Sequence, residues 1–220
     1  RLHPQSKDWR FDAEEDDNHF LSDNRQLTTL KMTTQAHAIL NIAILSKRSK
    51  PYLHSYACLG AVIPDVPIFI FFAVETFILR TPQGQLWSSR YFIEAWQNFF
   101  DIFNAVPLIL ILLGIGYYLM HSERMTIVAW SMLIHCAFDF LTHHDDGHRH
   151  FFPLSDFIFA SPISYWDQNH HAGIVEPIER LVILAVSIYL FPRLKTRFGR
   201  VVLVAINVLF LATFFLRRFF

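Results

Sequence analysis

The chain has 220 residues, of which 53% are hydrophobic and 16% aromatic, with 23 Phe. Its 19 Lys and Arg side chains balance 19 Asp and Glu, so the formal net charge is zero and nothing favours direct nucleic-acid binding by a basic surface. The apolar residues come in runs of about 15 to 20, a length that crosses the hydrocarbon core of a bilayer. We therefore expect an all-α, polytopic transmembrane bundle with the lipid bilayer as its surroundings; protein partners are not indicated.

Residues 1–31 differ from the rest of the chain. They are polar, have no apolar period and carry an acidic cluster at residues 12–17. They also lack the apolar core of a signal peptide. We expect a disordered tail or non-native extension before a start at Met32, and a membrane-embedded helical domain over residues 32–220.

Two predicted helices follow. Residues 35–45 are too short for a full span and predict a short or re-entrant helix with His37 near its beginning. Residues 53–79 predict a full span, interrupted by Pro64-Asp65-Val66-Pro67. The prolines remove backbone donors, which a membrane tolerates only where the released groups meet protein, water or an ion. Asp65 is therefore a candidate site residue; the plainer alternative is a cap on the second half of a broken helix.

The next segments are assigned by their apolar pattern. Residues 80–104 are amphipathic and aromatic, which predicts a helix at the membrane interface with Glu94 and Asp101 on its wet face. Further spans are expected at residues 105–120, 125–141, 176–190 and 201–216, for a total of about five. Lys and Arg gather in the loops at 46–52, 121–124 and 192–200, which places these loops on the cytoplasmic side and the histidine-rich loop on the opposite side.

The span at 125–141 carries the most informative pattern. His135, Asp139 and His143 are each four residues apart, so they share one face of a helix. A polar stripe in a helix of lipid-spanning length is costly unless it is paired or functional. Residues 143–173 then form a histidine-rich, aromatic loop that we expect to be a structured cap on the membrane surface.

Neutral histidine combined with carboxylate suits zinc, with iron as the alternative. The predicted metal ligands are His37, Asp65, His135 and Asp139. The candidates for a proton shuttle beside a metal-activated water are His143, His144 and Asp145. His143, His144 and His148 are also candidates for the ligands of a second metal ion. The alternative without any metal is a set of buried histidines paired with Asp139 and Asp65.

These residues also carry a resemblance. The early His37, the G-x-x-x-P-D segment ending at Asp65, the H-x-x-x-D pair His135/Asp139 and the Pro-Leu-Ser segment at 153–155 are similar to the bacterial family of LexA-binding, inner-membrane-associated metal-dependent hydrolases. The H-x-x-x-D pair resembles, more distantly, the zinc-dependent phospholipases C. These resemblances imply an inner-membrane hydrolase of a phosphoester or lipid-derived, amphipathic substrate. The family's Arg-x-x-Thr-His-Ser motif is missing, because residues 80–120 contain no histidine; the loop histidines are the candidate replacement.

Two other functions compete with this one. A membrane di-iron oxygenase of the desaturase or hydroxylase kind is suggested by fragments of histidine boxes at His144/His148 and His170/His171. A non-catalytic metal transporter or scaffold is the other alternative. Spans free of ionisable residues, at 105–120 and 201–216, and the lack of an internal repeat argue against a transporter.

Overall fold

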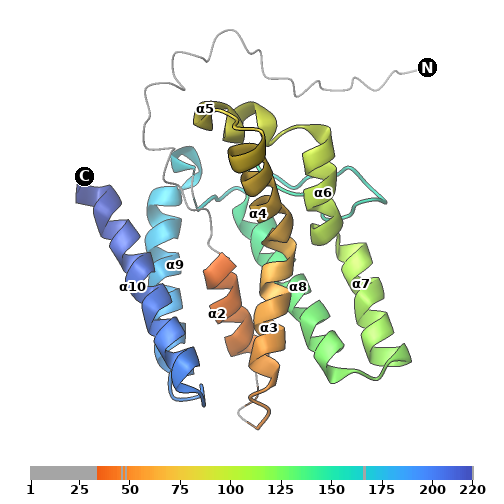
Figure 1. Cartoon of the computed structure of the whole chain (residues 1–220), viewed down its shortest axis with the longest axis vertical. Helices are drawn as coiled ribbons and strands as arrows, with labels where there is room; N and C mark the ends of the chain where they lie inside the picture. Colours follow the sequence, from red (N-terminus) through yellow and green to blue (C-terminus); the bar gives the residue numbers. More distant parts are fainter. Residues whose placement is uncertain (1–33, 46, 48, 166, 220) are drawn as a thin grey trace. The chain divides into compact units, whose positions relative to one another are not determined.

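The computed structural model describes residues 34–45, 47, 49–165 and 167–219, with side chains described up to residue 212. The expected tail at 1–31 and Met32 lie outside the described residues. In the described part of the chain every regular element is helical and no strand occurs, which confirms the all-α class (Figure 1).

The elements follow one another with short connections, apart from the long segment between α8 and α9. In chain order they are α2 (Thr34–Leu45), α3 (Leu53–Val62), η2 (Ile63–Asp65), α4 (Val66–Ala73), η3 (Val74–Ile78), α5 (Gln83–Gln85), η4 (Leu86–Arg90), α6 (Glu94–Asn104), α7 (Val106–Gly114), η5 (Ile115–Leu119), α8 (Glu123–Thr142), η6 (Gln168–His170), α9 (Ala172–Leu190) and α10 (Arg197–Phe219).

Three continuous helical stretches are long and apolar enough to cross a membrane: Leu53–Ile78, Glu94–Leu119 and Glu123–Thr142. The predicted count of about five spans is thus supported for three within the described residues. The second stretch begins at Glu94, so the segment expected to lie at the interface is partly the start of a candidate span. α9 carries three charged residues in its first half, Glu176, Glu179 and Arg180, and it is not among these three stretches.

The Pro64-Asp65-Val66-Pro67 segment changes the helix type without ending the helix. It forms the 3₁₀ turn η2 between α3 and α4, as the missing proline N–H groups require. The carbonyl of Pro64 accepts a hydrogen bond from Asn104 Nδ2 at 3.3 Å. Asp65 occupies the N-cap position of α4, but its side chain makes no capping hydrogen bond. The capping alternative is therefore not observed.

Residues 80–104 contain more buried polar groups than an interfacial helix predicts. Asp101 is 1% exposed and binds Arg149, so its assignment to a wet face is wrong. Three other residues of this segment, Thr81, Arg90 and Trp96, donate hydrogen bonds to the fully buried carboxylate of Glu75, which precedes the segment in η3. These acceptors hold the turn after η3 against the start of α6.

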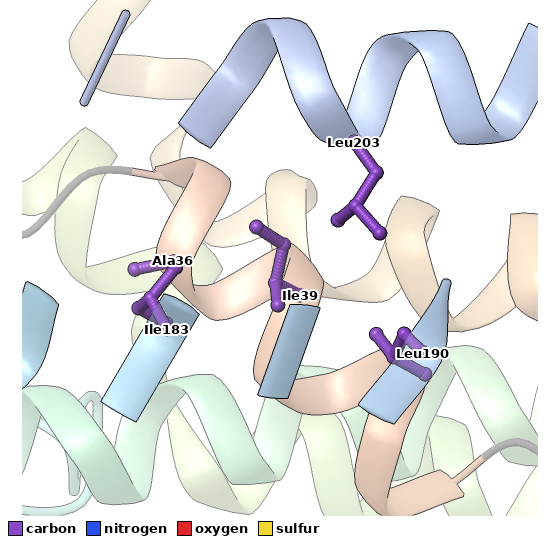
Figure 2. Packing of buried hydrophobic residues seen from close by; sticks show 5 residues of the cluster. All are labelled: Ala36, Ile39, Ile183, Leu190 and Leu203. Atoms are coloured by element: carbon purple, nitrogen blue, oxygen red, sulfur yellow. The ribbon is translucent and has the colours of Figure 1, made fainter. Parts of the chain in front are cut away.

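α2 packs between α3 and the pair of α9 and α10 (Figure 1). Figure 2 shows one side of this packing, where Ala36 and Ile39 of α2 meet Ile183 and Leu190 of α9 and Leu203 of α10. On its other side, α2 approaches α3 and α8, the most extensively packed helix pair in the described chain. This three-helix contact positions the residues described next.

Candidate metal centre

Three helices bring the four predicted metal ligands together. His37 comes from α2, Asp65 from η2, and His135 and Asp139 from α8. One ligand atom from each of His37, His135 and Asp139 lies within 4.8 Å of the others, and these three side chains are buried. The two oxygens of Asp139 divide between the rings: Oδ1 is 3.1 Å from His37 Nε2, and Oδ2 is 3.0 Å from His135 Nε2. This buried cluster could hold a metal ion.

Asp65 lies at the edge of the cluster. Its Oδ1 is 3.5 Å from His135 Nε2, while its Oδ2 accepts a hydrogen bond from Thr34 Oγ1 at 2.6 Å. The Asp65 side chain is 17% exposed, against 0 to 5% for the other three, so it is the most accessible of the four.

The ring of His135 is oriented for ligation. Its Nδ1 lies 2.7 Å from the carbonyl oxygen of Ala61. Because a carbonyl only accepts, Nδ1 carries a proton, and in the neutral ring the lone pair is then on Nε2. That Nε2 is buried and has no hydrogen-bond partner, although the carboxylates of Asp139 and Asp65 are close to it. A backbone acceptor on one ring nitrogen is the usual support of a metal-bound histidine.

The donor set fits a transition metal better than an alkaline-earth ion. Two imidazole nitrogens and a carboxylate, with a second carboxylate beside them, match the ligands of zinc and iron sites. The rings of His37 and His135 stack with centroids 3.8 Å apart, an arrangement that suits two neutral imidazoles and disfavours two charged ones. The orphaned Nε2 and this donor chemistry together make the cluster a credible metal site.

A chain of buried hydrogen bonds fixes the helices one turn from the cluster. Asn41 Nδ2 donates to the carbonyl and hydroxyl oxygens of Ser131 at 2.8 and 2.9 Å, and the Ser131 hydroxyl donates to the Ala57 carbonyl at 2.5 Å. Asn41 follows His37 by four residues and Ser131 precedes His135 by four, so the bonds join the same faces of α2 and α8. They set the register that places the two histidines opposite each other.

His143 lies beside the cluster, as its spacing predicts. Its Nε2 is 3.5 Å from Asp139 Oδ1 and its Nδ1 is 2.8 Å from Asp146 Oδ1. Tyr165 places its hydroxyl 3.2 Å from the same Nε2. Burial disfavours the charged ring, but the carboxylates of Asp146 and Asp139 outweigh it and raise the pKa of His143 to about 10. No local pattern indicated Asp146 or Tyr165 as a partner of His143, because both follow the end of α8 at Thr142.

The other two predicted shuttle residues lie apart from the cluster. His144 stacks on His170 with ring centroids 3.4 Å apart, and its Nδ1 lies 2.6 Å from the Ser161 carbonyl. Asp145 is exposed. Neither side chain forms an ion pair or hydrogen bond with the four predicted ligands. Their role in proton transfer remains a prediction.

His148 and His150 are buried in the same loop, with exposures of 3% and 4%. His150 Nδ1 is 3.0 Å from the His148 carbonyl oxygen. Burial, reinforced by the neighbouring imidazole of His148, lowers the pKa of His150 to about 4, so this ring is neutral at physiological pH. The loop therefore contributes buried, neutral imidazole near the predicted site.

Searches of known protein families, curated proteins and solved structures find no significant match to this chain. Its class rests on its own features: an all-helical chain with three candidate membrane-spanning helices and a buried His/Asp cluster that could hold a metal. An open hollow formed by Tyr52, Met120 and Ser122 to Arg124 lies at the beginning of α8. His135 is about 18 Å further along that helix, so the hollow is not part of the cluster.

Proposed function

We propose that this chain is a membrane-bound, metal-dependent hydrolase, with zinc as the metal. The observation that carries the proposal is the buried cluster of His37, His135 and Asp139, in which His135 Nε2 has no hydrogen-bond partner. Zinc in hydrolases is commonly held by about three protein ligands and keeps one position open. Zinc bound here would acidify a water molecule towards neutral pH and so supply the nucleophile.

The chain's own residues have distinct tasks in this proposal. His37, His135 and Asp139 hold the ion, and Asp65 completes its surroundings on the more exposed side. The Ala61 carbonyl fixes the tautomer of His135. His143 is oriented by Asp146 and faces Asp139, and its raised pKa keeps the ring protonated, which places it to give a proton to the leaving group.

The proposed substrate is a phosphoester of an amphipathic or lipid-derived molecule. The cluster lies in the half of α8 nearer its end at Thr142, beside the 143–165 loop. This loop exposes apolar side chains, with Phe151, Leu154 and Phe157 at 42%, 78% and 53% exposure. Such side chains sit well at a lipid surface, so a substrate with an acyl chain would reach the site from the bilayer.

We place the protein in a bacterial inner membrane, with the histidine-rich loop away from the cytoplasm. The turns before α3, before α8 and before α10 lie together at the lower end of the bundle in Figure 1. Lys50, Arg124, Arg193 and Arg200 belong to these turns or adjoin them. Positive charge at this end supports a cytoplasmic position for it.

Metal analysis of the purified full chain, combined with hydrolysis of a chromogenic phosphodiester bearing an acyl chain, tests the proposal. We expect zinc in the wild-type protein, and loss of both zinc and hydrolysis in His135→Ala and Asp139→Ala. His54→Ala, on α3 but outside the cluster, is the matched control and should keep both. Metal retained in both cluster variants would refute the assignment. Paired iron and oxygen-dependent turnover would instead favour the oxygenase.

A further inference from the structure

Three buried imidazoles lie together next to the first cluster, on the segment that leaves α8. They belong to His143, His148 and His150, which are 7%, 3% and 4% exposed. The ring centroids of His143 and His148 are 6.0 Å apart, and those of His148 and His150 are 6.1 Å apart. Three neighbouring imidazoles buried to this degree require partners for their ring nitrogens, because an unpaired buried polar atom is costly.

Two of these nitrogens have no such partner. His150 Nδ1 faces the His148 carbonyl at 3.0 Å, so Nδ1 carries the proton and the lone pair is on Nε2. His150 Nε2 and His148 Nδ1 are both buried and form no hydrogen bond. The carboxylate nearest to His148 Nδ1, that of Asp101, is 3.6 Å away and is already engaged by Arg149.

The backbone that carries these histidines is firmly anchored. Arg149, between His148 and His150, donates from its backbone N–H to Asp101 Oδ1 at 3.1 Å and from Nε to Oδ2 at 2.5 Å. The Val106 N–H donates to the His150 carbonyl at 2.8 Å. The loop is thus fixed to α6 and α7 by groups other than the imidazoles, which leaves the rings available to a ligand.

We propose that His143, His148 and His150 form a second binding site for a divalent cation of the zinc class. His143 already has Nδ1 against Asp146, so its Nε2 is the ligating atom, as Nε2 is in His150. Tyr165, now 3.2 Å from His143 Nε2, would give up this contact. The ring nitrogens are not gathered within 4.8 Å as those of the first cluster are, so binding of one ion by all three requires the side chains to rotate on the anchored backbone.

Asp139 connects the two sites. Its Oδ1 is 3.1 Å from His37 Nε2 and 3.5 Å from His143 Nε2, so one carboxylate oxygen faces both sets of histidines. A carboxylate between two ions is the arrangement of two-metal hydrolytic sites. The catalytic use of the second ion rests on the proposed hydrolase function, and with this ion bound His143 is a ligand and no longer a proton donor. Binding of the second ion does not depend on that function.

The test is the zinc content of the full chain in detergent, equilibrated with Zn²⁺ and freed of excess ion. We expect two equivalents in the wild type, one in the His148→Ala/His150→Ala double variant, and one in His37→Ala. His170→Ala, a half-buried histidine of the same loop, is the control and should keep two. H150C, which exchanges one zinc-binding side chain for another, should keep the second equivalent, and melting of the metal-free proteins checks folding.

The outcomes separate the two sites. One equivalent in the wild type, or wild-type zinc content in the double variant, would overturn the second site. Loss of all zinc in the folded double variant would also overturn it, because the histidines would then belong to a single site. Failure of the proposed function appears differently, as full zinc content in His37→Ala or as zinc binding without any hydrolysis.

Discussion

Gly60 is the position where a single methyl group tests how the metal cluster is built. A Cβ added there would lie 2.3 Å from the Val128 carbonyl oxygen and 2.6 Å from Ser131 Cβ. Ordinary contact begins at 3.4 Å, so α3 and α8 must separate by about 1.1 Å in Gly60→Ala. Both obstructing atoms belong to or adjoin the backbone of α8 and cannot simply rotate away.

The separation should reach the cluster through α3. The Ala61 carbonyl, adjacent to Gly60, accepts from His135 Nδ1 at 2.7 Å, and about 1 Å of movement removes that hydrogen bond. Overpacking costs about 1–3 kcal/mol and a lost buried hydrogen bond about 1 kcal/mol, so we expect a total of about 3 kcal/mol. For a chain of this size that corresponds to a fall in Tm of about 6–12 °C.

Thermal melting and zinc titration of Gly60→Ala measure both effects. We expect the lower Tm together with weaker zinc binding, because His135 loses the acceptor that fixes its tautomer. Gly114→Ala is the matched control: it is also a helical glycine, but a Cβ there meets nothing within 4 Å, so its Tm should be unchanged or higher. Wild-type Tm and zinc affinity in Gly60→Ala would refute the reasoning.

Three further predictions follow from other contacts. Asp101→Ala removes the buried carboxylate that holds Arg149, so the free energy of unfolding should fall by about 3–5 kcal/mol in denaturant or thermal melts. Proteolysis of the 143–165 loop should increase, and an unchanged digestion pattern would contradict the anchoring. Asn41→Ala breaks the bonds to Ser131 and should weaken zinc binding although Asn41 touches no ligand atom, whereas Asn207→Ala, between α9 and α10, should not. Zinc at 100 times its Kd should raise the free energy of unfolding by about 2.7 kcal/mol for one bound ion, so removing the metal with a chelator should lower Tm. An unchanged Tm would argue against specific binding.

The sequence predicted those features that depend on local spacing. In any α-helix, residues four apart lie on the same face. His135, Asp139 and His143 follow this spacing, and their side chains lie together in the structure. The prolines around Asp65 likewise predicted a change of helix geometry, because their missing N–H groups act locally. We predicted from ligand chemistry that His37 and Asp65 lie close to this face of α8. The packing of α2 and α3 against α8 brings them there.

Features that depend on tertiary contacts could not be read in the same way. Asp145 and Asp146 adjoin each other in a turn, and nothing in their order shows that Asp146 faces His143 while Asp145 is exposed. Asp101 has the polar spacing of a wet helix face, but Arg149, 48 residues later, folds back and buries it. A pattern within one helix cannot report a partner supplied by a distant loop.

X-ray absorption at the zinc edge tests the central claim most directly. It should be measured on the zinc-loaded His148→Ala/His150→Ala protein, so that only the cluster of His37, His135 and Asp139 contributes. We predict nitrogen and oxygen ligands at about 2.0–2.1 Å, with the scattering of two imidazoles, and loss of this signal in the same protein carrying Asp139→Ala. A sulfur shell near 2.3 Å, or an unchanged spectrum without Asp139, would contradict the account.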